Sequence, residues 1–171
     1  MKLDPARISF RPMTREDVPR LRSWLAAPHV AKWFTPEHGD WIVATVTGEQ
    51  VLAHPFIALH DETPIAFLIW ERLIDFPDVA ELYGVNDPHT INCDVFIGDP
   101  TSIHRGLGPP MIQRFLSRIH AENPELARCV IDPVVDNKAA IRAYEKAGFR
   151  WVRNAPDGEG EEVYLMELTL A

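Results

Sequence analysis

Cysteine is scarce in this chain of 171 residues, which contains only Cys93 and Cys129. Two isolated cysteines far apart in the sequence form neither a metal-ligand pattern nor a disulfide framework. The simplest interpretation is a pair of buried thiols in neighbouring strands. The histidines are scattered too, with no His-x-x-x-His spacing and no carboxylate cluster beside them, so the sequence indicates no metal site.

Long hydrophobic runs are also missing. No apolar stretch approaches the roughly 18 residues that a membrane-spanning helix requires. The first residues carry no hydrophobic core of a signal peptide. We therefore expect no membrane partner, no secretion signal and a cytoplasmic location.

Positive charge is in the minority. Lys and Arg number 17 against 25 Asp and Glu, which gives a net charge of −8 and a pI near 5.3. Nucleic-acid binding requires clustered Lys and Arg, so this composition argues against a nucleic-acid partner and favours a cationic substrate. The length and the 46% hydrophobic content fit one soluble globular domain over residues 1–171.

The expected order of elements mixes helices and strands. Alternation of polar and apolar residues predicts a strand at 7–12, and short apolar runs predict strands at 55–60 and 64–71. Further strands are expected at 91–97, 127–131, 149–153 and 163–170. Helical spacing predicts helices at 14–27, 29–34, 40–53, 106–122 and 137–146, with Pro36 and Gly39 as breaks before the third. Asp61-Glu62-Thr63 and Asp157-Gly158-Glu159-Gly160 read as turns. These elements predict an α/β (α+β) fold with a mixed sheet covered on both faces by helices.

Residues 74–90 fit neither periodicity, because they contain Pro77, Gly84 and Pro88. We expect a long loop here, which in a compact domain is usually functional or mobile. Six carboxylates and no Lys or Arg lie between Arg72 and Arg105, namely Asp75, Asp78, Glu81, Asp87, Asp94 and Asp99. Charge alone leaves two interpretations open, a solvated acidic loop or a surface that attracts a cationic ligand.

The chemistry-bearing stretch runs from Asp94 to Phe149 and is predicted to form a strand, a glycine turn, a helix, a strand and a second helix. The turn Arg105-Gly106-Leu107-Gly108 leads into a helix, where unpaired backbone N–H groups and the helix dipole favour phosphate. Arg105 adds a charged donor. The turn is not a dinucleotide fingerprint, because Met111 stands where the third glycine would be, and no Gly-Lys-Ser/Thr follows as in a P-loop.

A second motif begins about 30 residues after the turn and contains Asn137, Ala140, Tyr144, Gly148 and Phe149. Together the two motifs resemble the GCN5-related N-acetyltransferase (GNAT) superfamily. Its members carry a Gln/Arg-x-x-Gly-x-Gly/Ala loop followed by Asn-x-x-Ala-x-x-x-Tyr-x-x-x-Gly-Phe. The second motif is complete here, whereas the loop has Ile103 in place of its first Gln or Arg. The resemblance implies the GNAT fold, a single domain with a sheet of about six to seven strands that splays between its two central parallel strands.

The resemblance also implies acetyl-CoA as the acetyl donor. Its pyrophosphate would lie on the backbone amides of the loop, and its pantetheine would lie in the splay of the sheet. The implied cofactor-binding residues are Phe96, Ile97, His104, Arg105, Gly106, Leu107, Gly108, Asn137, Ala140 and Tyr144. Tyr144 would protonate the departing thiolate as a general acid. The alternative for Tyr144 is a packed core tyrosine.

Within this superfamily, the whole chain resembles the aminoglycoside 6′-N-acetyltransferases. The shared features are Arg11-Pro12-Met13-Thr14, Trp24-Leu25, His29-Val30 with Trp33, Asp87-Pro88 and Asp132-Pro133. The resemblance implies that Asp94 is the base that deprotonates the acceptor amine, or the residue that anchors it. It also implies that Asp132 helps to hold the sugar or its amine. An inward-facing Asp94 suits these roles, and a solvent-facing Asp94 is the alternative.

The acidic residues before Gly106 would attract such a polycationic acceptor. The implied substrate-binding residues are Asp94, Asp132, Glu81, Tyr83 and Asp87; Tyr83 and Trp70 are candidates for stacking on sugars, although Trp70 also suits a core position. We expect a small-molecule amine as partner and a monomer or homodimer. Three alternatives stay open: an acyltransferase for another amine such as hydroxylysine in siderophore assembly, an intrinsic acetyltransferase with incidental drug activity, and a non-catalytic acyl-CoA-binding domain of the same fold.

Overall fold

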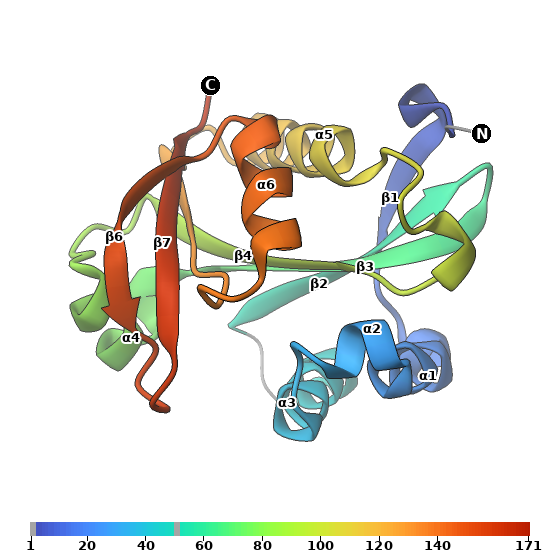
Figure 1. Cartoon of the computed structure of the whole chain (residues 1–171), viewed down its shortest axis with the longest axis horizontal. Helices are drawn as coiled ribbons and strands as arrows, with labels where there is room; N and C mark the ends of the chain where they lie inside the picture. The colour runs from blue at the N-terminus through green and yellow to red at the C-terminus, as the bar shows by residue number, and fades with distance from the viewer. Residues whose placement is uncertain (1–2, 50–51) are drawn as a thin grey trace. The chain divides into compact units, whose positions relative to one another are not determined.

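The computed structural model describes residues 3–49 and 52–171, and these ranges contain six α-helices and seven strands (Figure 1). The strands are β1 (Ile8–Pro12), β2 (Ala53–His60), β3 (Thr63–Arg72), β4 (Thr90–Ile97), β5 (Arg128–Ile131), β6 (Arg150–Pro156) and β7 (Glu162–Thr169). The α-helices are α1 (Val18–Ala26), α2 (Pro28–Ala31), α3 (Pro36–Thr47), α4 (Pro77–Tyr83), α5 (Gly108–Glu122) and α6 (Lys138–Ala147). Short 3-10 helices are η1 (Pro5–Arg7), η2 (Arg15–Asp17), η3 (Leu73–Asp75) and η4 (Pro100–Ser102).

The strands form one mixed sheet, as the sequence predicts, and their order in it is β1-β2-β3-β4-β5-β7-β6. The β1–β2, β5–β7 and β6–β7 pairs are antiparallel, whereas β4 and β5 are parallel. The parallel ladder joins residues 90–92 to residues 128–130, and β4 continues beyond it to Ile97. The hairpin between β2 and β3 turns at Asp61 and Glu62, which both have positive φ, as in a type I′ hairpin turn.

The chain divides into two compact units. Unit 1 contains Met1–Trp70 and Asp94–Leu107, and unit 2 contains Glu71–Cys93 and Gly108–Ala171. Both β3 and β4 contribute residues to each unit. Each unit has a hydrophobic core of its own. The single domain expected from the length of the chain stays a prediction.

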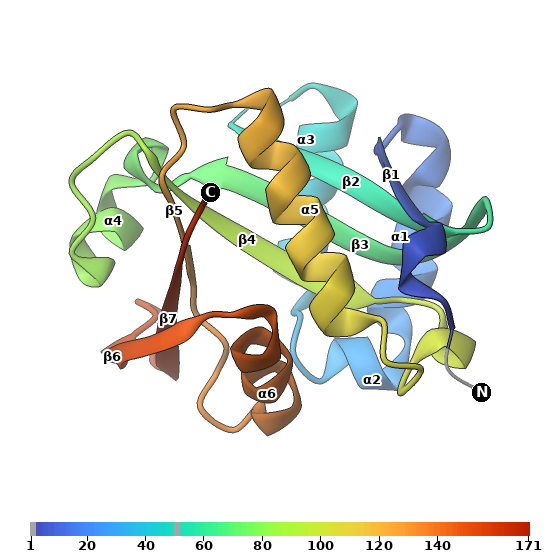
Figure 2. The same ribbon diagram turned by 90° about the horizontal axis from the view of Figure 1, so that it is seen from above.

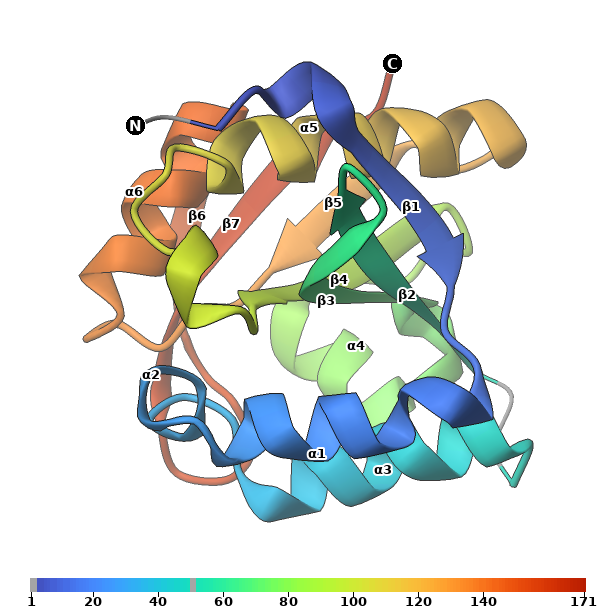
Figure 3. The same cartoon turned by 90° about the vertical axis from the view of Figure 1, so that its right-hand side faces the viewer.

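Unit 1 is built on β1, β2 and β3, which follow one another in the sheet (Figure 2). Its helices α1 and α3 lie side by side (Figure 3) and bury Leu21 and Ile42. The core of unit 1 centres on Phe96, whose ring centroid lies 4.9 Å from that of Phe34 and 5.2 Å from that of Phe67. Phe96, an implied cofactor contact, is therefore also a core residue of unit 1.

The helix expected at 40–53 has different bounds in the structure. It begins at Pro36, because Thr35 has the extended conformation of an N-cap and proline is well tolerated in the first helical position. It ends at Thr47, after which Gly48 is left-handed. The interpretation of Pro36 and Gly39 as breaks was therefore wrong. Val51, an expected helix anchor, lies outside the described residues.

The long loop expected at 74–90 was also wrong, because α4 occupies Pro77–Tyr83. Pro77 is its first residue, and Gly84 has the left-handed conformation that ends it. Buried residues of this segment pack in the core of unit 2 with the strand residues Val130 and Leu165; they are Leu73, Ala80, Tyr83 and Val85. The segment is therefore an ordered part of unit 2.

Unit 2 also contains α5, β5, α6 and the hairpin of β6 and β7 (Figure 1). The side-chain Nε2 of Gln113 on α5 donates a hydrogen bond to the carbonyl oxygen of Ala147 on α6 at 3.3 Å. The predicted turn between β6 and β7 is confirmed, with Asp157 Oδ1 accepting hydrogen bonds from the backbone N–H groups of residues 159–161. No helix within the described ranges is both long and apolar enough to span a membrane.

Candidate functional site

The residues singled out by sequence divide between the two units. Unit 1 contains Asp94, Phe96, Ile97, His104, Arg105, Gly106 and Leu107. Unit 2 contains Glu81, Tyr83, Asp87, Gly108, Asp132, Asn137, Ala140 and Tyr144. Their roles in binding and catalysis stay predictions, and the geometry of each group is described within its own unit.

The loop that follows β4 in unit 1 begins with a close backbone approach at Gly98. The N–H groups of Gly98 and Asp99 both donate to the carbonyl oxygen of Ile65, at 3.0 and 3.1 Å. A Cβ atom on Gly98 would lie 2.0 Å from a ring carbon of Trp24, a distance that real Cβ atoms do not show. A side chain at this position would force the Trp24 ring or the loop to move, so the close packing of the loop against Trp24 requires glycine.

Asp99 then holds the next turn of the loop together. Its Oδ1 accepts a hydrogen bond from the N–H of Thr101 at 3.1 Å, and its Oδ2 accepts one from the buried Ser102 hydroxyl at 2.6 Å. Partial burial alone would raise the pKa of Asp99, but the hydrogen bonds from Ser102 and Thr101 outweigh it and lower that pKa. This acidic residue, which charge alone left unassigned, therefore caps η4.

The backbone alternates in conformation where the sequence predicts the phosphate-binding loop. His104 and Gly106 have φ of 60° and 80°, whereas Arg105 and Leu107 have negative φ. Such alternation is typical of backbone nests, whose N–H groups converge on an anion. The Arg105 Nε donates to the carbonyl oxygen of Thr101 at 3.1 Å, and Leu107 is 1% exposed. The left-handed conformation of His104 has no signal in the sequence.

Two further predicted residues of unit 1 lie on β4. Asp94 is half-buried, a state between the inward-facing and the solvent-facing alternatives. Ile97 is also half-buried, and its carbonyl oxygen lies 3.0 Å from Nε2 of His29. Trp70, at the end of unit 1's part of β3, is buried and stacks on His54 with ring centroids 4.1 Å apart, in agreement with the core alternative.

The Asn137 motif forms the start and the end of α6 in unit 2. Asn137 is the N-cap, and its side-chain oxygen accepts a hydrogen bond from the N–H of Ala140 at 3.2 Å. Tyr144 is 7% exposed, and its ring meets the ring of Phe149 edge-on with centroids 5.5 Å apart. The Tyr144 ring is thus part of the core of unit 2, while the acid role of its hydroxyl stays a prediction.

A carboxylate held by two side chains follows β5. The Tyr83 hydroxyl donates to Oδ2 of Asp132 at 2.5 Å, and the Asn92 amide donates to Oδ1 at 3.2 Å. Asn92 and Tyr83 are 5% and 6% exposed, whereas Asp132 is half-buried. Sequence reasoning named Asp132 and Tyr83 but missed Asn92. The available signal was an asparagine between the apolar residues Ile91 and Cys93 of a strand, where a buried amide needs a partner.

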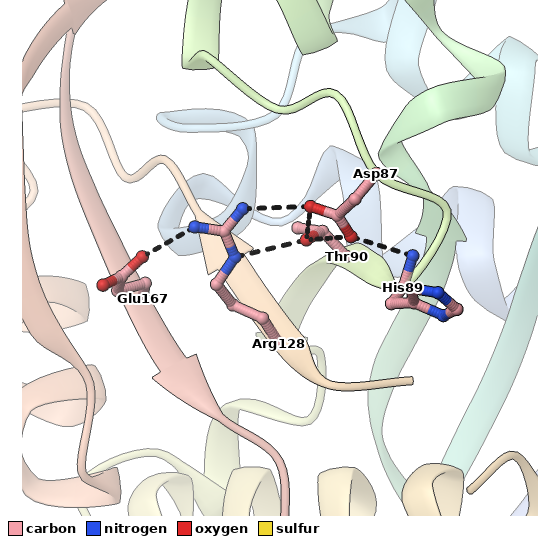
Figure 4. Close-up of polar contacts among 5 residues, drawn as sticks. All are labelled: Asp87, His89, Thr90, Arg128 and Glu167. Atoms are coloured by element: carbon pink, nitrogen blue, oxygen red, sulfur yellow. Dashed lines mark hydrogen bonds and ion pairs between the residues drawn. The ribbon is translucent and has the colours of Figure 1, made fainter. Parts of the chain in front are cut away.

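Asp87 belongs to a network of polar contacts around Arg128 in the same unit (Figure 4). It accepts hydrogen bonds from the N–H of His89 and the hydroxyl of Thr90, at 2.9 and 3.0 Å. Arg128 lies between Asp87 Oδ2 at 3.4 Å and Glu167 Oε2 at 3.1 Å. Burial would raise the pKa of Asp87, but these donors and the Arg128 charge lower it. Asp87 thus stabilises the turn before β4.

Glu81, the remaining predicted substrate residue, is exposed on α4. Across the described ranges, no three His, Cys, Asp or Glu side chains come together in a group that could hold a metal ion.

Residues 13–155 match the acetyltransferase (GNAT) domain family. The chain belongs to the GNAT acetyltransferases. The match covers both motifs, the Arg105 to Gly108 loop and the Asn137 to Phe149 segment. The GNAT resemblance drawn from these motifs is thereby confirmed.

Two of the relatives have names that specify different acceptors. The aminoglycoside N(6′)-acetyltransferase type 1 of Klebsiella pneumoniae is 28% identical over 167 residues, which cover 94% of this chain and 82% of the relative. The lysine N-acyltransferase MbtK of Mycolicibacterium paratuberculosis is 28% identical over 155 residues, which cover 88% of this chain and 68% of the relative.

Solved structures share the fold. The crystal structure of the aminoglycoside acetyltransferase AAC(6′)-Ib in complex with coenzyme A and kanamycin superposes with a TM-score of 0.77 at 23% identity. The superposition covers 95% of this chain and 94% of that one. This likeness confirms the GNAT fold that the two sequence motifs imply.

Proposed function

We propose that this acetyltransferase uses acetyl-CoA to acetylate a primary amine, and that its acceptor is the 6′-amine of an aminoglycoside. The observation that carries the proposal is the 28% identity with the Klebsiella pneumoniae aminoglycoside enzyme along 94% of the chain. The net charge of −8 supports a polycationic acceptor. In a sensitive bacterium, such an enzyme would confer aminoglycoside resistance.

We assign acetyl-CoA binding and protonation of its thiolate to the loop that ends at Leu107 and to α6. The alternating backbone of His104 to Leu107 suits the pyrophosphate of acetyl-CoA, because N–H groups in a nest bind anions without a side-chain partner. Tyr144 is proposed to protonate the coenzyme A thiolate as it leaves. A proton delivered to the sulfur neutralises the negative charge that develops as the C–S bond breaks.

The acceptor amine must be in its neutral form when it attacks. An alkylammonium is protonated at neutral pH, so a base must remove one proton before the nitrogen lone pair attacks the thioester carbonyl. The C–N bond then forms, the C–S bond breaks, and the amide nitrogen releases its second proton. We assign Asp94 as the base, acting directly or through water, or as the anchor of this amine.

A second candidate acceptor is a lysine-type amine. It is favoured by one observation, the 28% identity with the lysine N-acyltransferase MbtK over 88% of this chain. Both candidates share the same chemistry, so the acceptor alone distinguishes them.

Release of free coenzyme A thiol from acetyl-CoA, followed with a thiol reagent, tests the proposal. We expect kanamycin to promote release with a kcat/KM at least tenfold above that of lysine or hydroxylysine. Turnover with the lysine-type acceptors and none with kanamycin would establish the second candidate. Absence of release with every amine would contradict the enzymatic proposal and leave a binding domain.

The assigned roles are tested by two substitutions in the same assay. We expect Asp94→Asn and Tyr144→Phe each to lower kcat by a factor on the order of 100 or more, as the loss of a general base or acid does. Asp40→Asn and Tyr164→Phe are the matched controls, since Asp40 is exposed on α3 and Tyr164 lies on β7. An unchanged kcat in either test variant would remove that residue from the mechanism.

A further inference from the structure

Asp99 makes a dense set of hydrogen bonds at the start of the loop in unit 1. Its Oδ1 accepts from the N–H of Thr101 at 3.1 Å, and its Oδ2 accepts from the Ser102 hydroxyl at 2.6 Å. The Thr101 hydroxyl lies 3.0 Å from Oδ1 and 2.8 Å from Oδ2. Both carboxylate oxygens are therefore engaged within the loop, which sets Asp99 apart from acidic residues that could attract a cationic acceptor.

Thr101 connects Asp99 to the nest, the residues 104–107 whose backbone alternates in conformation. The N–H of Thr101 is held by Asp99, and its carbonyl oxygen accepts a hydrogen bond from the Arg105 Nε at 3.1 Å. Arg105 stands between the two left-handed residues of the nest. A continuous series of hydrogen bonds thus runs from the Asp99 carboxylate through Thr101 to the middle of the nest.

The nest needs such support because one of its left-handed residues is not glycine. His104 has a φ of 60°, in a region that residues with a Cβ atom disfavour. A conformation of this kind persists only where the surrounding structure holds it. The buried Leu107 anchors the end of the nest, and the hydrogen bonds from Asp99 through Thr101 to Arg105 restrain its middle.

We infer that Asp99 is a positioning residue for the pyrophosphate of acetyl-CoA, which acts through Thr101 and Arg105 to hold the nest in its anion-binding conformation before the donor arrives. A loop that already has its bound conformation loses less conformational entropy when the ligand binds. The carboxylate of Asp99 would repel a phosphate that it contacted, so it acts on the pyrophosphate only through the loop. This inference rests on the proposed binding of pyrophosphate at residues 104–107.

The test compares two ligands that share the pantetheine arm. Coenzyme A carries the pyrophosphate, whereas pantetheine ends before it. Calorimetric titration measures the Kd of coenzyme A, and competition with coenzyme A measures the Kd of pantetheine. We expect Asp99→Ala to raise the Kd of coenzyme A about threefold to tenfold, as the loss of one or two hydrogen bonds does, and to leave that of pantetheine within about twofold.

Asp4→Ala is the matched control, because Asp4 also precedes a proline and caps a 3-10 helix. It is the N-cap of η1 and accepts a hydrogen bond from the N–H of Ala6 at 2.9 Å. Its replacement should leave both Kd values within about twofold. Thermal unfolding checks that each variant is folded at the temperature of the titration. If Asp99→Ala is unstable, Asp99→Asn carries the same test with a smaller expected effect, since it keeps one acceptor oxygen.

A merely structural role for Asp99 would raise the Kd of both ligands by the same factor, and this result would overturn the inference. An unchanged Kd of coenzyme A in the folded variant would overturn it as well. If wild type binds coenzyme A but acetylates no amine, the proposed function is refuted while the binding data still decide on Asp99. Failure of wild type to bind coenzyme A would refute the donor assignment and the inference with it.

Discussion

Two regions with proposed binding roles are held in shape in different ways. The loop from Gly98 to Leu107 in unit 1 is shaped by backbone geometry, with a close approach at Gly98 and left-handed residues at His104 and Gly106. The region around Asp132 in unit 2 is shaped by side chains that come from distant positions. The backbone region is formed by residues that follow one another in the sequence, whereas the side-chain region depends on the tertiary fold to bring distant residues together.

The largest expected effect concerns the backbone region. Gly98→Ala places a methyl group 2.0 Å from the Trp24 ring, so the ring or the loop must move. We expect a loss of about 3 kcal/mol in the free energy of unfolding, as for severe overpacking. Urea denaturation measures this loss. Gly108→Ala is the control, because its Cβ would lie 3.9 Å from that of Ala143, an ordinary contact; equal effects of the two substitutions would contradict the assignment.

A smaller effect is expected in the side-chain region. Asn92→Ala removes the donor to Asp132 and to the carbonyl oxygen of Val130 in a buried position. We expect about 2 kcal/mol of destabilisation, because buried polar groups lose their partners. The same denaturation experiment on Asn86→Ala, at an exposed position, should give less than about 0.5 kcal/mol. If Asn92→Ala is equally mild, the hydrogen bonds around Asp132 do not hold that region together.

The smallest effect is a pH dependence that belongs to Asp99. Its folded-state pKa is lowered, so its contribution to stability is present above the unfolded pKa of about 3.9 and is lost as the pH falls through the folded value. Asp99→Asn should therefore be less stable than wild type at neutral pH, and the difference should shrink below about pH 4. Thermal unfolding between pH 2 and pH 7, roughly the span of that titration, measures it. A difference that stays constant with pH would exclude the charge of Asp99 as its cause.

Proline explains most of what the sequence analysis misassigned. Pro36 and Pro77 were interpreted as breaks, yet each is the first residue of a helix, α3 and α4 respectively. Proline removes an N–H that has no helical partner in the first turn, so it favours a helix start as readily as it ends one. Gly48 and Gly84 then end the same helices. If Pro77 had been interpreted as the start of a helix and Gly84 as its end, the sequence would have predicted α4.

The sequence analysis recognised those candidate residues that belong to short motifs. The Arg105 to Gly108 loop and the Asn137 motif were recognised because their residues stand at fixed spacings on one turn or one helix. Asn92 was missed because its partner Asp132 is 40 residues away, and only the pairing of β4 with β5 brings the two together. Asp99 and Asp87 were grouped with the acidic residues by charge, although both stabilise turns.

The most direct test of the account is to identify the nitrogen that is acetylated. Wild-type enzyme is incubated with acetyl-CoA and kanamycin, and the product is analysed by mass spectrometry and NMR. The account predicts one acetyl group, on the 6′-nitrogen, and a yield that falls when Asp94→Asn replaces wild type. Acetylation at another nitrogen, or recovery of unmodified kanamycin with active enzyme on a lysine-type amine, would contradict it.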